Sequence, residues 1–387
     1  MLRSEFENEC RMLGEIFGLP GSGVNDRFEF RGGLGFHHPE CTSSKGSVHM
    51  LLVTGGGGFV MGHVVCRWLV QHSETQVLVV DTLPMDVALQ HKLGASASRV
   101  EWIQGDVRNL DSLIPATHFE QIEFVVHGAA VTSISHRVHA DGPGKPGLGV
   151  ARTSVLTNID GALAVLGLIP QLPNLMRVVN VSSGSVYASA SEHQPLPEDQ
   201  SVAPEDLYAI SKRCGEDFVE FARRELDAPV VSVRLSGVFG PLDRETPSRA
   251  VSCVPKRFAN ALAEQRELSV RSLDAAGDFI HADDVADAIL ALLDAAHLSH
   301  PVYNVAAGEL SSLRHLAAYA AELDAGFAVR ETGDSSAEID YEAHRTTGRW
   351  GAYDVSRIRA DTGWSPGALR ERFQSYVLEY KKARMDV

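Results

Sequence analysis

Residues 51–62, Leu-Leu-Val-Thr-Gly-Gly-Gly-Gly-Phe-Val-Met-Gly, decide how the rest of this chain can fold. Before the glycines, residues 49–53 predict a short apolar strand. After them, apolar side chains recur at helical spacing and predict a helix over 59–71. The turn between the two favours glycine, because it leaves little room for a Cβ atom.

Two of the glycines have distinct tasks in such a turn. Gly55 permits the tight turn itself, and Gly58 lets a phosphate group approach the backbone. The backbone amides of Phe59 and Val60, at the start of the expected helix, would then face that phosphate with the positive end of the helix dipole. Glycine spacing alone is a weak signal, since a flexible loop has the same composition.

An acidic residue downstream strengthens this interpretation. Residues 76–80 predict a second strand, which ends in Asp81. An acid at that place can accept hydrogen bonds from the ribose hydroxyls of adenosine, and it would repel a 2′-phosphate. The pattern therefore favours NAD over NADP as the cofactor.

One position departs from the dinucleotide-binding pattern. The third glycine of the spacing falls where the chain has Met61, and Gly62 follows one place late. The third glycine normally allows the helix to pack closely on the sheet. We therefore expect a slightly shifted helix and a weaker hold on the cofactor.

The composition excludes several classes of protein. The chain has 387 residues and a formal net charge of −15, which argues against nucleic acid and anionic membranes as partners. No apolar run of about 18 residues is evident, so no membrane association is expected. Five widely spaced cysteines indicate reduced thiols in a cytoplasmic protein. The histidines form no recognised ligand spacing, so no metal site is expected.

Strand and helix patterns alternate from residue 48 onward. Strands are expected over 49–53, 76–80, 99–103, 124–130, 176–182 and 230–235. The alternation predicts an α/β fold, a Rossmann-like, doubly wound parallel sheet. We expect an irregular extension over 1–47, an NAD-binding domain over 48–235, and a smaller, mainly substrate-binding C-terminal lobe over 236–387.

Two loops after strands are further candidates for cofactor contact. Asp106 could bond the adenine amino group while Val107 lies against the ring, although a plain turn is the alternative. Ala129 and Ala130 follow the fourth strand, and their small side chains let the backbone approach a dinucleotide.

The strongest chemical signal is Tyr208-Ala-Ile-Ser-Lys212. Tyr208 and Lys212 share one face of a helix, and an ammonium near a phenol favours its ionised form. Tyr208 is therefore a candidate acid/base, and Lys212 could also bind the nicotinamide ribose. Ser183 lies at the carboxyl end of a strand, where ligands bind in such sheets. Taken separately, the first pair would be a solvated face and the serine part of a polar turn.

These stretches together resemble the extended short-chain dehydrogenase/reductases of the NAD-dependent epimerase/dehydratase type. The matching stretches, between residues 49 and 365, are VTGGGGFV, VVD, GDVRN, VVHGAA, NIDG, SSGSVY, YAISK, RLSGVFGP, GDFIHADDVADAI and YNVAAGE. The resemblance implies a catalytic group of Ser183, Tyr208 and Lys212, supported by Asn158. It also implies a lobe that clasps a sugar, often a nucleotide sugar, and a homodimer formed through the helices around 153–169 and 206–226.

Departures from the family pattern bear on the substrate. Dehydratases of the family carry an Asp-Glu pair directly after the catalytic hydroxyl; this chain has Gly184 and Ser185 there, which argues against dehydration. Nucleotide-sugar enzymes of the family often carry an arginine where this chain has Gly277.

Other residues are candidates to bind the substrate. Ser183 and Ser185 offer hydroxyls at the expected reaction centre. Arg271, Arg345 or Arg349 could replace the missing arginine, because a guanidinium pairs bidentately with phosphate. Each of these arginines is otherwise a surface residue.

The chemistry expected is hydride transfer between a sugar and NAD. Tyr208 takes the proton of the sugar hydroxyl, Ser183 holds the forming carbonyl oxygen, and Lys212 keeps Tyr208 acidic. If the keto intermediate turns over while bound and takes the hydride back, the protein is a nucleotide-sugar epimerase, the outcome that the motifs favour. If it leaves, the protein is an NAD-dependent dehydrogenase of a free sugar, sugar acid or polyol. A non-catalytic NAD-binding regulator is the third alternative.

Overall fold

The computed structural model describes residues 49–132, 148–187, 194–246, 248–249, 252–341 and 351–385, with the backbone alone for 148–151 and 153. The chain divides into two units, Met1–Ser47 and Val48–Val387. Every described residue belongs to the second unit. The N-terminal extension, Arg345 and Arg349 lie outside the described residues.

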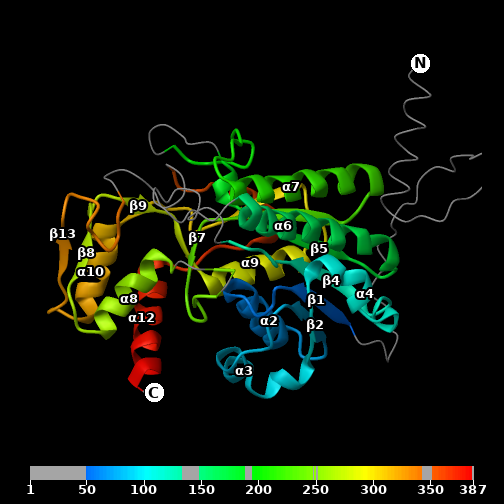
Figure 1. Cartoon of the computed structure of the whole chain (residues 1–387), viewed down its shortest axis with the longest axis horizontal. Helices are drawn as coiled ribbons and strands as arrows, with labels where there is room; N and C mark the ends of the chain where they lie inside the picture. The colour runs from blue at the N-terminus through cyan, green and yellow to red at the C-terminus, as the bar shows by residue number, and fades with distance from the viewer. Residues whose placement is uncertain are drawn as a thin grey trace, which may run out of the picture. The chain divides into compact units, whose positions relative to one another are not determined.

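A seven-stranded parallel sheet forms the centre of the second unit (Figure 1). Its strands lie in the order β11 (Val302–Val305), β6 (Val230–Leu235), β5 (Arg177–Ser183), β4 (Ile122–His127), β1 (Met50–Thr54), β2 (Gln76–Asp81) and β3 (Val100–Gln104). The chain runs outward from β1 in both directions, so the strand order reverses between β1 and β4. The Rossmann-like fold predicted from the sequence is confirmed, and ligands bind such sheets beside this reversal.

Apolar side chains cover both faces of the sheet, as a parallel sheet between two helical layers requires. In β1, Leu51 and Val53 belong to one buried cluster, whereas Met50 and Leu52 belong to the other. The first face is covered by α2 (Phe59–Gln71), α3 (Val87–Leu93), α9 (Ala282–Asp294) and α11 (Ser356–Thr362). The second is covered by α4 (Leu110–Leu113), α6 (Leu148–Leu168) and α7 (Leu207–Leu226). Figure 1 shows α6 and α7 on one side of the sheet and α2 on the other.

A third apolar cluster forms the core of the smaller lobe. It lies between α8 (Val254–Ala263), α10 (Leu313–Leu323) and α12 (Leu369–Met385). Three short strand pairs accompany these helices: β7 (Gly237–Phe239) with β10 (Phe279–His281), β8 (Leu268–Val270) with β13 (Val329–Glu331), and β9 (Ala276–Gly277) with β12 (Ser311–Ser312). The 3₁₀ helices are η1 (Gly94–Arg99), η2 (Val107–Asn109), η3 (Ala116–His118), η4 (Ile169–Gln171) and η5 (Gly184–Val186).

One helical stretch, Ser154–Gln171, has the length and mean hydropathy of a membrane span. This corrects the prediction that no apolar run is long enough. Val165, Leu168 and Ile169 of the stretch are buried in the cluster on the second face of the sheet. Packing within the fold therefore accounts for these apolar residues, and 33% of the stretch is buried.

Met61 is accommodated by a glycine on the neighbouring strand end. Helix α2 begins directly after Gly58, and Met61 is buried in its first turn, 3% exposed. A Cβ atom added to Gly128, which follows β4, would lie 2.2 Å from Sδ of Met61. Close packing of the helix on the sheet requires a residue without a side chain at this contact. Here that residue is Gly128, and position 61 carries the methionine.

Substitution of Gly128 tests this packing. Gly128→Ala is expected to destabilise the protein by roughly 1–3 kcal/mol, because the added methyl group must displace a buried methionine. Gly167→Ala, in α6, is the control: no atom of the described residues lies within 4 Å of the added Cβ, and alanine favours a helix by roughly 1 kcal/mol. Urea unfolding at a fixed NAD concentration measures both. A Gly128→Ala variant as stable as the wild type would contradict the proposed packing.

Candidate active site

The glycine turn closes directly on the end of β4. Gly55 has φ +74°, and a Cβ there would lie 2.7 Å from Cα of Ala129. A Cβ at Gly56 would lie 2.6 Å from Cγ1 of Val79. Gly58 is the N-cap of α2 and makes no side-chain cap bond. The amides of the first turn of α2 are therefore available to a ligand.

Asp81 faces the glycine turn from the end of β2. Its Oδ2 accepts a hydrogen bond from the backbone amide of Gly57 at 2.9 Å, and its Oδ1 accepts one from Leu83 at 3.0 Å. A Cβ at Gly57 would lie 3.1 Å from the same Oδ2. The carboxylate is thus held beside the turn, at the end of β2.

Asp106 is engaged by a neighbour that the sequence prediction omits. Arg108 donates to it from Nε at 3.0 Å and from Nη2 at 2.6 Å, and this pairing lowers the pKa of the Asp106 carboxyl. Val107 is buried, and a Cβ at Gly161 of α6 would lie 2.8 Å from its Cγ1. The adenine contacts of Asp106 and Val107 stay predictions.

Asn158 ties the loop after β4 to α7. Its Oδ1 accepts from the amide of Val131 at 2.7 Å. Its Nδ2 donates to the carbonyl of Val131 at 3.2 Å and to Oγ of Ser211 at 2.9 Å. Asn158 is therefore a positioning residue for the loop that carries Ala129 and Ala130.

The structure brings Ser183, Tyr208 and Lys212 together where β5 ends and α7 begins. Ser183 lies close enough to Tyr208 for its hydroxyl to lower the pKa of the phenol. Nζ of Lys212 lies 5.9 Å from the centre of the Tyr208 ring and donates to the carbonyl of Val181 at 2.9 Å. Lys212 itself is buried.

Burial and nearby polar groups act in opposite directions on the pKa of Tyr208. Burial raises the pKa of Tyr208, while the hydroxyl of Ser183 and the positive charge of Arg249 act in the opposite direction. Burial lowers the pKa of Lys212 to about 8, against the effect of Glu216. The ammonium of Lys212 donates to the carbonyl of Val181, and the positive charge of Arg249 favours the phenolate of Tyr208. That Lys212 keeps Tyr208 acidic stays a prediction.

A buried ion pair fastens α7 beneath this group. Glu216, one helical turn after Lys212, accepts from Oγ of Ser182 at 2.6 Å and pairs with Arg234 of β6 at 2.8 Å. Both charged side chains are at most 3% exposed. Buried charges persist when they are paired in this way, so the pair fixes α7, and with it Tyr208, on β5 and β6.

Tyr353 fills the space beside the residue that follows the catalytic serine. A Cβ at Gly184 would lie 1.8 Å from Oη of Tyr353. The amide of Tyr353 donates to Oδ2 of the buried Asp278 at 3.1 Å, and its ring packs edge-on against Tyr187. Only glycine fits at position 184, so the acid that a family dehydratase carries there is sterically excluded.

The remaining substrate candidates are placed differently. The amide of Ser185 donates to Oγ of Ser183 at 3.2 Å, so Ser185 adjoins the catalytic group. Arg271 follows β8, which Figure 1 shows well apart from β5, and pairs with Asp340 at 3.1 Å. The structure does not bring Arg271 to the catalytic group, and Arg345 lies outside the described residues.

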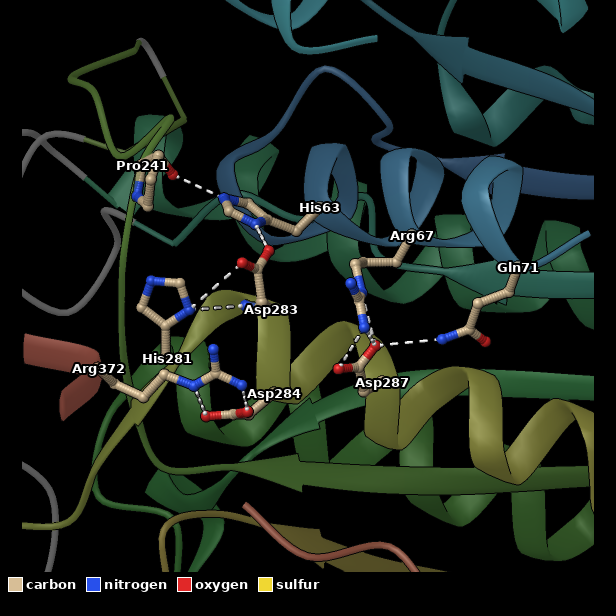
Figure 2. Close-up of polar contacts among 9 residues, drawn as sticks. All are labelled: His63, Arg67, Gln71, Pro241, His281, Asp283, Asp284, Asp287 and Arg372. Atoms are coloured by element: carbon tan, nitrogen blue, oxygen red, sulfur yellow. Dashed lines mark hydrogen bonds and ion pairs between the residues drawn. The ribbon is translucent and has the colours of Figure 1, made fainter. Parts of the chain in front are cut away.

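Figure 2 shows a polar network that fastens α2 to α9. Nδ1 of His63 lies 2.5 Å from Oδ1 of Asp283, and its Nε2 lies 2.8 Å from the carbonyl of Pro241. His281 caps α9 by accepting from the amide of Asp283. Burial would raise the pKa of Asp283, but the hydrogen bond and charge of His63 hold it well below its usual range. Further ion pairs in the view are Arg67–Asp287 and Arg372–Asp284.

Residues 51–306 match the NAD dependent epimerase/dehydratase family. This chain belongs to that family. A putative UDP-glucose 4-epimerase of Methanocaldococcus jannaschii is 25% identical over 69% of this chain and 80% of its own length. The dTDP-D-glucose 4,6-dehydratase of Homo sapiens is also 25% identical, over 83% of this chain and 86% of its own.

Solved structures share the fold. The UDP-glucose 4-epimerase of Thermotoga maritima, crystallised with UDP-glucose, has a TM-score of 0.67 at 23% identity and covers 87% of this chain and 99% of its own. A UDP-glucose-4-epimerase of Stenotrophomonas maltophila with bound NAD has a TM-score of 0.71 at 21% identity. The match covers 87% of this chain and 99% of that structure's chain.

The residues present fit the NAD on which the family depends. Gly55 and Gly56 leave a cradle that a Cβ would fill, and the first turn of α2 offers its amides to the diphosphate. Asp81 would hold the adenosine ribose, and Tyr208 with Lys212 would face the nicotinamide ribose. The protein is therefore an NAD-dependent enzyme of the epimerase/dehydratase type.

Substitution of Asp81 tests the cofactor preference. Asp81→Ser is expected to reduce the preference for NAD over NADP by about tenfold or more, because the carboxylate both bonds the ribose and repels a 2′-phosphate. Fluorescence titration with NADH and NADPH measures the two dissociation constants. Asp111→Ser, which removes an exposed acid in α4, should leave the ratio as in the wild type. If Asp81→Ser left the ratio of the NADH and NADPH dissociation constants unchanged, the adenosine ribose would not be bound by Asp81.

Proposed function

We propose that this protein is an NAD-dependent nucleotide-sugar epimerase. The observation that carries the proposal is the hydroxyl pair Ser183–Tyr208 next to Gly184, whose missing side chain is replaced by the ring of Tyr353. The curated relatives include both epimerases and dehydratases. A dehydratase needs an acid beside the serine, and this site leaves no room for one. Hydride transfer is the chemistry that the remaining groups support.

Each polar group has a task in that reaction. NAD, when bound, takes up the hydride of the substrate carbon and returns it. Tyr208 accepts the proton of the substrate hydroxyl and gives it back, and Ser183 holds the oxygen between the two steps. Lys212, with a pKa of about 8, can exchange a proton near neutral pH. Asn158 keeps the loop after β4 and α7 in register.

An NAD-dependent dehydrogenase of a free sugar, sugar acid or polyol is the second candidate. Gly277 favours it, because nucleotide-sugar enzymes of the family often have an arginine at this place. Gly277 is buried in β9, where it pairs with Ser311. The strand therefore offers no cation there to a substrate diphosphate.

We also propose that the protein is a cytoplasmic homodimer. Helices α6 and α7 pack side by side (Figure 1). Ile210 and Phe221 lie three turns apart on one face of α7 and are 40% and 48% exposed. Free thiols at Cys66, Cys214 and Cys253 support a reducing compartment. Light scattering should give twice the mass of one chain, and Phe221→Glu should give a monomer; a monomeric wild type overturns this proposal.

Replacement of the catalytic tyrosine tests the reaction. Tyr208→Phe is expected to slow conversion of a nucleotide sugar to its epimer by about 10²- to 10⁴-fold, because the proton acceptor is lost. Chromatography of nucleotide sugars after incubation measures conversion, and absorbance of NADH is followed in the same samples. Tyr319→Phe in α10 is the control. Steady NADH accumulation without epimer, lost in Tyr208→Phe, would instead establish the dehydrogenase.

A further inference from the structure

A segment of the smaller lobe crosses the glycine turn. It comprises residues 241–246, 248 and 249, which follow β7, and is called the strap here. At its start, the carbonyl of Pro241 accepts from Nε2 of His63 at 2.8 Å (Figure 2). Leu242 has φ +66°, and its Cδ1 lies 3.1 Å from where a Cβ at Gly62 would be. The strap therefore begins packed against α2, in a backbone conformation that contacts must hold.

Arg244 bonds the glycine turn itself. Its Nη2 donates to the carbonyl of Gly57 at 3.0 Å and lies 2.5 Å from Oδ2 of Asp86. Gly57 is the residue whose amide binds Asp81. Arg244 is thus held by Asp86 and bonds the same glycine as the carboxylate that would hold the adenosine ribose.

Arg249 lies over the first residue of α2. Its Cζ is 5.3 Å from the ring centre of Phe59. Its Nε donates at 2.8 Å to Asp243, whose side chain is 1% exposed. The neighbouring carbonyl of Ser248 accepts from both the amide and Oγ1 of Thr132, at 2.8 and 2.9 Å. This end of the strap is therefore anchored to the loop after β4.

The two guanidiniums contact the residues on either side of Gly58 in the chain. Arg244 bonds the carbonyl of Gly57, and Arg249 lies over the ring of Phe59. Gly58 is the N-cap of α2, where the family's cofactor places its diphosphate. Guanidiniums bind phosphate oxygens through paired, charge-assisted hydrogen bonds. Among the described residues, the bonds of Arg244 are made through Nη2 and that of Arg249 to Asp243 through Nε, so other guanidinium nitrogens can donate to an anion at the turn.

We propose that the strap encloses the diphosphate of NAD and that Arg244 and Arg249 bind it. The backbone amides of α2 hold the diphosphate from one side, and the two arginines close the other. Release of the cofactor then requires the contacts of Arg244 with Gly57 and of Ser248 with Thr132 to break. This inference concerns the cofactor alone and holds whether the reaction is epimerisation or oxidation.

Dissociation of NADH from the full-length protein tests the proposal without any substrate. The protein is loaded with fluorescent NADH and mixed with excess NAD, and the loss of bound-NADH fluorescence gives the dissociation rate. Arg244→Ala and Arg249→Ala should each raise this rate by about tenfold or more, and the double variant by about 100-fold. Arg330→Ala is the matched control, since Arg330 of β13 pairs with Glu267 on the exposed surface.

Folding and substrate effects are separated by further measurements. Thermal midpoints without cofactor show which variants are folded. Arg244→Lys and Arg249→Lys keep the charge but lose the paired guanidinium N–H donors, so they should give intermediate rates of NADH dissociation. A double variant that releases NADH within twofold of the wild-type rate overturns the proposal. So does unchanged release with a raised KM for UDP-glucose, which would assign the arginines to the substrate diphosphate. Neither result depends on the Tyr208→Phe experiment.

Discussion

The contact of the Gly55 backbone with the Ala129 backbone is the constraint on which the rest of this structure depends. A Cβ atom at Gly55 would lie 2.7 Å from Cα of Ala129, so no other residue fits. The contact brings the carboxyl ends of β1 and β4 together where the strand order reverses. Asp81 at the end of β2 and Ser183 at the end of β5 lie along the same edge. A dinucleotide laid across this edge reaches both of them.

Features that depend on local pattern could be predicted from the sequence. The inner strands of the central sheet are apolar on both faces, and the glycine turn has its own spacing. The fold and the cofactor could therefore be predicted from these two features. Ser183 and Tyr208 could be predicted because one ends a strand and the other begins a helix. In a parallel sheet these two places adjoin, and the effect of Ser183 on the pKa of Tyr208 follows from that topology.

Features that depend on contacts between distant segments could not be predicted from the sequence. The packing of Met61 on Gly128 joins two residues that are far apart in the sequence, and neither residue alone predicts the contact. Arg249 near Tyr208 and Tyr353 at Gly184 come from the part of the chain after β6, whose short strands of two to four residues leave almost no periodicity. The charge and the shape of the site are therefore set by the part of the chain that the sequence describes least.

Transfer of a deuterium label tests most directly whether the hydride returns to the sugar that lost it while NAD stays bound. UDP-glucose deuterated at C4, the carbon named in the epimerases of similar fold, is incubated with the protein and excess unlabelled free NAD and NADH. Mass spectrometry then follows the label in the separated nucleotide sugars and in free NADH. The account predicts an epimer that keeps its deuterium and free NADH without label. Deuterium in free NADH, or an epimer without it, would contradict the account.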